Sequence, residues 1–195
     1  MQQLARGLSR WTAPHPDWEP SPKKGSPADW PQLVGSVAYE TDGVLVLVDP
    51  LVPNGAWGEL DRLAQRKRVH VLTTLGFHRR SREAVRERYG AETSNAKASL
   101  PEGVETIQIR NAGERMIWIR EHGALVPGDR ILGAARGGLR VCPDSWLAYL
   151  GNRTSPALLR KELQKLLDLP VRMVLVSHGE PVLRDAKRKL ARAVA

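Results

Sequence analysis

Cysteine is almost absent from this chain of 195 residues. Cys142 is the only one, so the chain can form no internal disulfide and no zinc finger built on several cysteines. Long apolar runs are missing too: none approaches the roughly 20 residues that span a bilayer, and residues 1–18 lack the apolar core of a signal peptide. We therefore expect a cytoplasmic protein with no membrane partner, in which Cys142 is a small buried apolar residue.

Common nucleotide-binding and hydrolase motifs are also missing. The sequence contains no Walker loop, no G-x-G-x-x-G and no G-x-S-x-G. It shows no internal repeat and no low-complexity tract. These absences argue against nucleotide binding and against a serine-hydrolase activity.

Acidic residues are fewer than basic ones, 21 against 30, which gives a formal charge of +9. Such a balance favours anionic partners. The arginines of 79–90 and 184–195 are interleaved with acids, however, which is typical of solvated helix faces rather than of a nucleic-acid-binding arm. Nucleic-acid binding is therefore the last of the functions that we consider.

Proline and tryptophan are concentrated near the N-terminus. Six prolines lie between positions 12 and 31, and at that density they forbid a regular helix or a central strand. Trp11, Trp18 and Trp30 need apolar cover, so this stretch is expected to be a long surface loop beside a functional site. We expect residues 1–32 to pack as a Pro/Trp-rich segment on a single domain that spans 33–195.

The rest of the chain mixes strands and helices. Residues 33–40 and 43–52 read as a hairpin around Thr41-Asp42-Gly43. Further strands are predicted at 69–74, 103–110, 115–120, 138–142 and from 171 to His178, and helices at 55–68, 81–90, 154–170 and 181–195. This order predicts an α/β domain with helices on its outer faces.

Four segments resemble a known family in their order and spacing. They are GVLVLVDPLVP (43–53), VHVLTTLGFH (69–78), GALVPGDRIL (123–132) and VLVSHGEPV (174–182). From Val34 onward the chain is similar to the metallo-β-lactamase fold superfamily, most of all to small bacterial members that begin with a Trp-Thr-Ala-Pro-His-Pro-type segment. The resemblance implies a four-layer αββα sandwich of two mixed sheets with outer helices.

The family's H-x-H-x-D-H motif falls on residues 73–78, where only His78 is kept. Thr73 and Leu75 stand in place of the first two histidines, and Phe77 stands in place of the aspartate. The family's middle histidine should fall near 111–114, where this chain has none. The resemblance therefore implies that the first of the two family metals has lost its histidines.

The ligands of the second family metal are better preserved. The resemblance implies that His78, Asp129 and His178 supply three of its four protein ligands. Two imidazoles and one carboxylate are enough in kind for a single Zn, Fe or Mn ion. This predicts a degraded binuclear site that keeps a mononuclear one, in a hydrolase-like protein that is impaired or inactive as a binuclear hydrolase.

Other interpretations of these residues stay open. Each of the three has an ordinary structural role in a turn, so the pocket could hold no metal at all. Its partner would then be a small molecule, anionic if the nearby Arg79, Arg80 and Arg82 bind it. His15, with Trp11 and Trp18, is a candidate lid over the pocket, and His122 and His70 are weaker candidates to complete a metal site.

Overall fold

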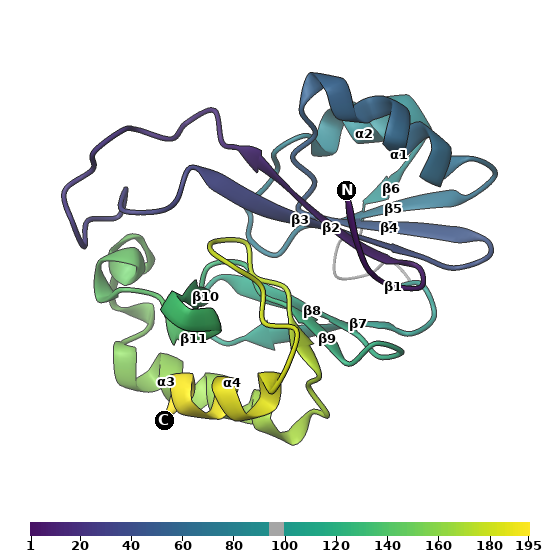
Figure 1. Cartoon of the computed structure of the whole chain (residues 1–195). Coiled ribbons are helices and arrows are strands. Elements are labelled where there is room, and N and C mark those ends of the chain that lie inside the picture. The colour runs from purple at the N-terminus through teal and green to yellow at the C-terminus, as the bar shows by residue number, and fades with distance from the viewer. Residues whose placement is uncertain (94–99) are drawn as a thin grey trace.

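The chain folds into four layers, in the order helices, sheet, sheet, helices (Figure 1). The structure is a computed structural model, and it describes residues 1–93 and 100–195. Both sheets are mixed, because each combines antiparallel neighbours with a parallel pair. The α/β sandwich expected from the sequence is confirmed.

The first sheet has six strands that follow one another in sequence order. Its neighbours are antiparallel from β1 to β4 and parallel from β4 to β6. The strands are β1 (Gln2–Ala5), β2 (Leu8–Pro14), β3 (Leu33–Glu40), β4 (Val44–Val48), β5 (Arg68–Leu72) and β6 (Glu92–Thr93). The predicted hairpin around Thr41-Asp42-Gly43 is confirmed, as it joins β3 to β4.

Two helices cover the outer face of this sheet: α1 (Trp57–Ala64), which a short 3-10 turn η1 (Asn54–Ala56) precedes, and α2 (Arg82–Tyr89) (Figure 1). Side chains alternate between the faces of a strand. Leu45 and Leu47 of β4 accordingly pack in one cluster with Leu60 of α1, whereas Val46 and Val48 face the second sheet.

The second sheet is built from the chain's C-terminal half, and a separate hairpin lies beside it. Its strand order is β12-β9-β8-β7, with β12 parallel to β9. The strands are β7 (Val104–Ile109), β8 (Glu114–Ile119), β9 (Ala124–Val126) and β12 (Met173–Val174), and the hairpin is β10 (Ile131–Ala134) with β11 (Gly138–Val141). Ile117 and Ile119 of β8 fill the space between the two sheets.

Two further helices cover the second sheet on its outer side (Figure 1). Apolar residues of both, such as Leu163 and Leu190, pack against Met116 and Trp118 of β8. The elements are α3 (Pro156–Gln164), α4 (Ala186–Val194) and the 3-10 segments η2 (Ala135–Gly137), η3 (Asp144–Arg153) and η4 (Lys165–Asp168). Of the helices in the described residues, none has both the length and the apolar character that a bilayer span requires.

Three sequence-based predictions of elements need correction. Residues 8–14 form a strand despite the nearby prolines, because Pro14 is the last residue of β2 and leaves its ladder intact. The predicted strand up to His178 is only two residues long, since residues 175–180 bond to elements of both sheets instead. Helix α4 begins at Ala186, so Pro181 lies outside its first turn.

Candidate metal centre

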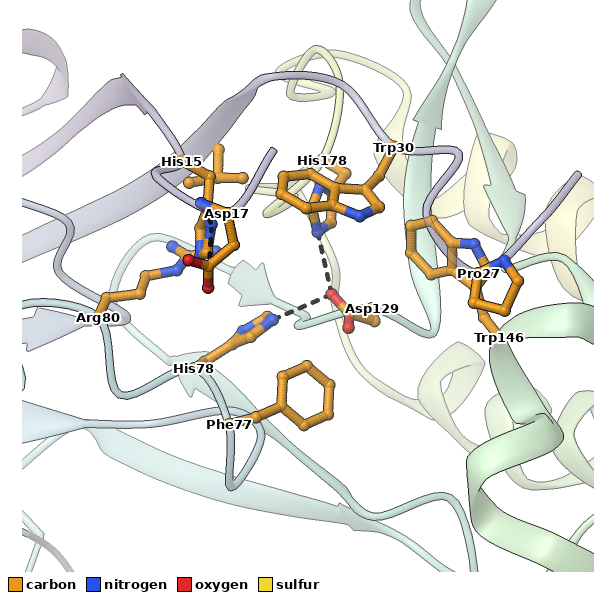
Figure 2. Close-up of a pocket in the computed structure, with 11 residues that line it drawn as sticks. His15, Asp17, Pro27, Trp30, Phe77, His78, Arg80, Asp129, Trp146 and His178 are labelled. Carbon is orange, nitrogen blue, oxygen red and sulfur yellow. Dashed lines mark hydrogen bonds and ion pairs between the residues drawn. The ribbon is translucent and has the colours of Figure 1, made fainter. Parts of the chain in front are cut away.

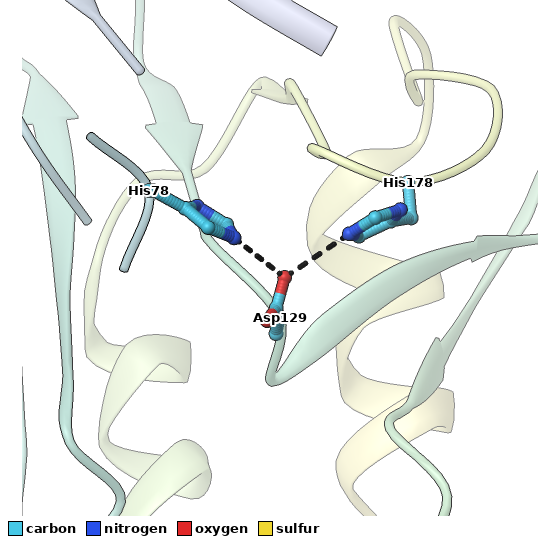
Figure 3. A group of neighbouring side chains, drawn as sticks. All are labelled: His78, Asp129 and His178. Carbon is cyan, nitrogen blue, oxygen red and sulfur yellow. Dashed lines mark ion pairs between the residues drawn. The ribbon is translucent and has the colours of Figure 1, made fainter. Parts of the chain in front are cut away.

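Three buried side chains from separate segments of the chain point toward one another (Figure 3). His78 follows β5, Asp129 follows β9 and His178 follows β12, and each is at most 7% exposed. The Nε2 atoms of both histidines lie 3.2 Å from the same oxygen, Oδ1 of Asp129. The three potential ligand atoms all lie within 4.8 Å of one another. The residues that the sequence singled out as possible metal ligands are thus brought together.

The shared oxygen is unusual because it is buried and short of hydrogen bonds. No hydrogen bond of acceptable geometry reaches Oδ1 of Asp129 from any residue that the structure describes, although two imidazole nitrogens are close. Both imidazole nitrogens face this one oxygen, and a donor set that converges in this way suits a cation placed among the three groups. A buried carboxylate normally has its lone pairs satisfied. The donor set and this oxygen therefore fit a metal ion.

The ring of His78 is held from its other nitrogen by Asp49 and Thr74. Nδ1 lies 2.9 Å from Oδ2 of Asp49 and 3.1 Å from the hydroxyl oxygen of Thr74. Asp49 in turn accepts the backbone N–H of Thr74 at 2.8 Å and the hydroxyl of the same residue. This arrangement keeps the proton on Nδ1 and directs Nε2 toward Asp129. Sequence reasoning did not single out Asp49, although its place directly after buried strand β4 was a usable signal.

His178 is positioned by backbone pairing and by aromatic rings. The carbonyl of His178 accepts the N–H of Gly133, and the neighbouring carbonyl of Ser177 accepts the N–H of Gly35. The rings of Trp30 and Trp146 meet its imidazole edge-on, each with a centroid separation of 5.5 Å. Its Nδ1 has no hydrogen-bond partner among the described residues. Packing, rather than a hydrogen bond, therefore orients this ring.

Asp129 lies in a tight turn whose backbone N–H groups donate to the carboxylate of Glu114. The carboxylate of Glu114 accepts the backbone N–H groups of Gly128 at 3.1 Å, Asp129 at 2.7 Å and Arg130 at 2.9 Å. A Cβ at Gly128 would come within 2.6 Å of the hydroxyl oxygen of Thr74, so only glycine fits there. Glu114 is fully buried and lies in the stretch where the resemblance would place the middle histidine. Sequence reasoning missed its role.

The electrostatics of the group reflect burial and close opposite charges. Burial lowers the pKa of His78, but Asp129 and Asp49 outweigh it and raise that pKa to about 9. Burial raises the pKa of the Asp129 carboxyl, and the two histidines more than reverse this and hold it below its usual range. Burial lowers the pKa of His178 and raises the pKa of Glu114 to about 7.

A cavity of about 400 Å³ opens above the three residues (Figure 2). Its walls are largely aromatic: Trp30 and Trp146 lie beside His178, and Phe77, 57% exposed, meets His78 edge-on at 5.1 Å. His15 lines the rim and meets Trp30 edge-on at 5.1 Å. The N-terminal segment thus contributes to the pocket, as its tryptophans suggested, but through Trp30 rather than Trp11 or Trp18.

Solved structures share the fold of nearly the whole chain and little of its sequence. VMB-1 matches with a TM-score of 0.62 at 10% identity, over 99% of this chain and 94% of that chain. The DIM-1 metallo-β-lactamase, exposed to ceftazidime, matches with a TM-score of 0.60 at 10% identity, over 99% and 94%. The metallo-β-lactamase family protein TTHA1429 from Thermus thermophilus matches with a TM-score of 0.53 at 14% identity, over 97% and 79%.

The chain has the metallo-β-lactamase fold. No protein-family model and no curated protein sequence matches it. The fold that the sequence resemblance implied is thereby confirmed.

Within this metallo-β-lactamase fold, the altered motif positions face different sides. Phe77 lines the cavity beside His78. Thr73 and Leu75 instead line a second hollow on the other side of the same chain segment. Neither residue is among the groups that meet at Asp129.

The placement of the other candidate residues corrects several expectations. Trp11 is buried on the outer face of β2, where its indole N–H donates to the carbonyl of Leu51. The indole N–H of Trp18 donates to the carbonyl of Trp30, and neither tryptophan lines the cavity. His70 is buried on β5 with its Nδ1 3.7 Å from a carboxylate oxygen of Glu92, and His122 packs against Tyr39.

The arginines near His78 also differ from expectation. Arg80 lines the cavity, but its guanidinium donates to the carbonyls of Gly35 and Asp49 and to the hydroxyl of Ser177. Its hydrogen bonds therefore connect β3, the residue that follows β4 and the segment that carries His178. Arg79 and Arg82 line the second hollow instead.

Proposed function

We propose that this protein binds one divalent metal ion through Nε2 of His78, the carboxylate of Asp129 and Nε2 of His178. The convergence of these three buried ligand atoms on one point, around an oxygen without a proper hydrogen bond, carries the proposal. Zn, Fe and Mn are all compatible with two imidazoles and one carboxylate. The cavity above them would then receive a small molecule, in keeping with its size and its aromatic walls.

When bound, such an ion supplies Lewis acidity at the floor of the cavity. The protein's own residues do the rest. Asp49 keeps the proton of His78 on Nδ1, and Glu114 keeps the turn of Asp129 in place. Trp30, Trp146 and Phe77 present apolar faces that exclude water and hold a ligand by its apolar surface.

We infer that the protein does not work as a binuclear hydrolase. Leu75 offers no donor atom, and Thr73 lines a different hollow. The nearest acid to the missing middle histidine, Glu114, is committed to three backbone N–H groups. A single-metal site, active or not as a hydrolase, is the function that these residues support best.

An anionic ligand in this cavity is the weaker alternative. Arg80 is the only arginine among the described residues that line the cavity, and it already makes three hydrogen bonds. His15, at the rim, is neutral near pH 7 because burial and Arg80 lower its pKa. We therefore expect ligands with an apolar or aromatic body.

The direct test is the metal content of the protein purified without an affinity tag. After exposure to Zn²⁺, Mn²⁺ or Fe²⁺ and removal of loosely bound ions, mass spectrometry should find about one ion of a preferred metal per chain. A content far below one ion for all three metals would overturn the proposal.

Asp49→Asn should weaken metal binding by about 10- to 100-fold, the usual effect of removing the partner of a ligating histidine. Asp49 has a positive φ of 45°, a conformation that asparagine adopts readily, so the backbone should be undisturbed. Competition with a coloured chelator measures the affinity. Asp61→Asn, which removes an exposed carboxylate paired with Arg88, is the matched control and should leave the affinity unchanged.

Metal binding near pH 7.5 should release about one proton. The raised pKa of His78, about 9, means that its imidazole is protonated in the metal-free protein and must lose a proton to become a ligand. His178, whose pKa is lowered, is already neutral. Affinity should therefore rise with pH up to about 9. Calorimetry in two buffers of different ionisation enthalpy counts the proton, and a count of zero would contradict this protonation state.

A further inference from the structure

A second hollow lies on the other side of the segment that carries His78. It has a volume of about 340 Å³, and its lining is more polar than that of the metal-site cavity. The residues that matter for its chemistry are Thr73, Arg79, Arg82, Gln108, Glu114 and Arg115. They come from the segment after β5, from α2 and from the neighbouring strands β7 and β8. None of them is among the three residues of the candidate metal centre.

The segment from 73 to 79 borders both sites. Thr74 and His78 bond to Asp49 on the side of the metal centre. Thr74 also lines the hollow, together with Thr73 and Arg79. Thr73 and Leu75 stand at two motif positions where the resemblance would place ligands of the first metal. In this protein both residues line the second hollow.

The charge inside this hollow is strongly positive. The guanidinium groups of Arg79 and Arg115 make no hydrogen bond or ion pair with any residue that the structure describes. Arg82 is paired with the exposed carboxylate of Glu83. The carboxylate of Glu114, which also borders the hollow, is fully buried and bonded to the backbone N–H groups of 128–130. Within the described part of the chain, two arginines therefore share a concave surface, and neither of them is paired with a carboxylate.

We propose that this hollow binds a phosphate dianion, either free or as the monoester of a small molecule. Guanidinium groups match the oxygens of phosphate with paired N–H donors, and the hydroxyl of Thr73 adds a further donor. The volume is at the lower end of small-molecule sites, which run from roughly 300 to 1,000 Å³. The exposed acids Glu83 and Glu87 on α2 would repel an extended polyanion, so a small ligand fits better than a nucleic-acid strand.

The test is calorimetric titration of the metal-free protein, in the presence of EDTA, with inorganic phosphate and with ribose 5-phosphate. Chloride at the same ionic strength is the reference. Saturable binding of either phosphate is expected, and it should weaken at least tenfold in Arg79→Gln/Arg115→Gln. Arg62→Gln/Arg120→Gln changes the net charge equally at distant exposed sites and should bind as the wild type does. Tighter binding of the ester would identify a phosphorylated small molecule, and equal binding would identify the free dianion.

Three results would overturn the proposal. The first is no saturable phosphate binding beyond the effect of chloride. The second is equal weakening in both double variants, which would indicate general charge attraction. The third is a short single-stranded oligonucleotide that binds more tightly than both phosphates and depends on the same two arginines. His178→Ala should keep phosphate binding, which separates this site from the metal centre.

Discussion

The His178→Ala variant is expected to retain far less than one metal ion per chain under conditions in which the wild-type protein holds about one. His178 is one of three potential ligands that the described residues bring to this point, so its loss leaves two. Removing a group that merely supports a ligand costs about 10- to 100-fold in affinity, and removing a ligand should cost more than about 100-fold. Mass spectrometry of the two proteins after identical metal exposure measures the difference.

A second readout separates loss of metal from loss of fold. A ligand at 100 times its dissociation constant stabilises the folded state by about 2.7 kcal/mol, so metal should raise the thermal midpoint of the wild type. The variant should show no such shift and keep the circular dichroism of the wild type. His122→Ala removes a histidine that packs against Tyr39 away from the site, and it should keep both the metal and the shift. A His178→Ala protein with a full complement of metal would refute the ligand set.

Much of the fold could be predicted from the sequence, because its signals are local. Two apolar runs and an Asp-Gly turn identify β3 and β4, and Gly90, with a φ of 62°, ends α2. Ser155 caps α3 through the N–H of Leu158. His78, Asp129 and His178 occupy the positions at which the resemblance implies metal ligands, and this was enough to predict that the three side chains lie close together.

The parts that could not be predicted depend on contacts between distant segments. Strand β2 contains Arg10, a buried arginine that reads as a solvent-exposed residue in the sequence. Its guanidinium donates to the carbonyls of Val176 and Gly179, 166 and 169 positions away. Only the fold reveals that these two carbonyls, in the irregular segment that follows β12, accept hydrogen bonds from such a donor.

The same reason explains why the supports of the metal centre were missed. Trp146 lies in η3, a 3-10 segment without a clear periodic pattern, and its ring meets that of His178 through a contact between segments far apart in the sequence. Glu114 occupies the first position of β8, where a charged residue normally faces solvent. Neither position carries a sequence signal that separates it from an ordinary surface residue.

Glu114 gives the second large expected effect, on stability rather than on metal binding alone. Glu114→Ala leaves the three N–H groups of residues 128–130 without an acceptor and takes a negative charge away from the fully buried Arg130. Each buried group left unpaired costs about 1–3 kcal/mol, and the loss of the charge opposite Arg130 adds to this. We expect a loss of at least about 4 kcal/mol in the free energy of unfolding, measured by urea denaturation.

Such a loss is close to the whole stability of many domains, about 5–15 kcal/mol, so a milder variant is needed as well. Glu114→Gln keeps the shape of the side chain and one acceptor oxygen, but it turns an amide N–H₂ toward one of the three N–H groups. It should lose about 1–3 kcal/mol and fold. Because the turn that it loosens carries Asp129, this variant should also bind metal more weakly, by about 10- to 100-fold.

Glu105→Gln, on the adjacent strand with an exposed carboxylate, is the control and should change stability by less than about 0.5 kcal/mol. If Glu114→Gln matched Glu105→Gln in both stability and metal affinity, the turn of Asp129 would not depend on the buried carboxylate.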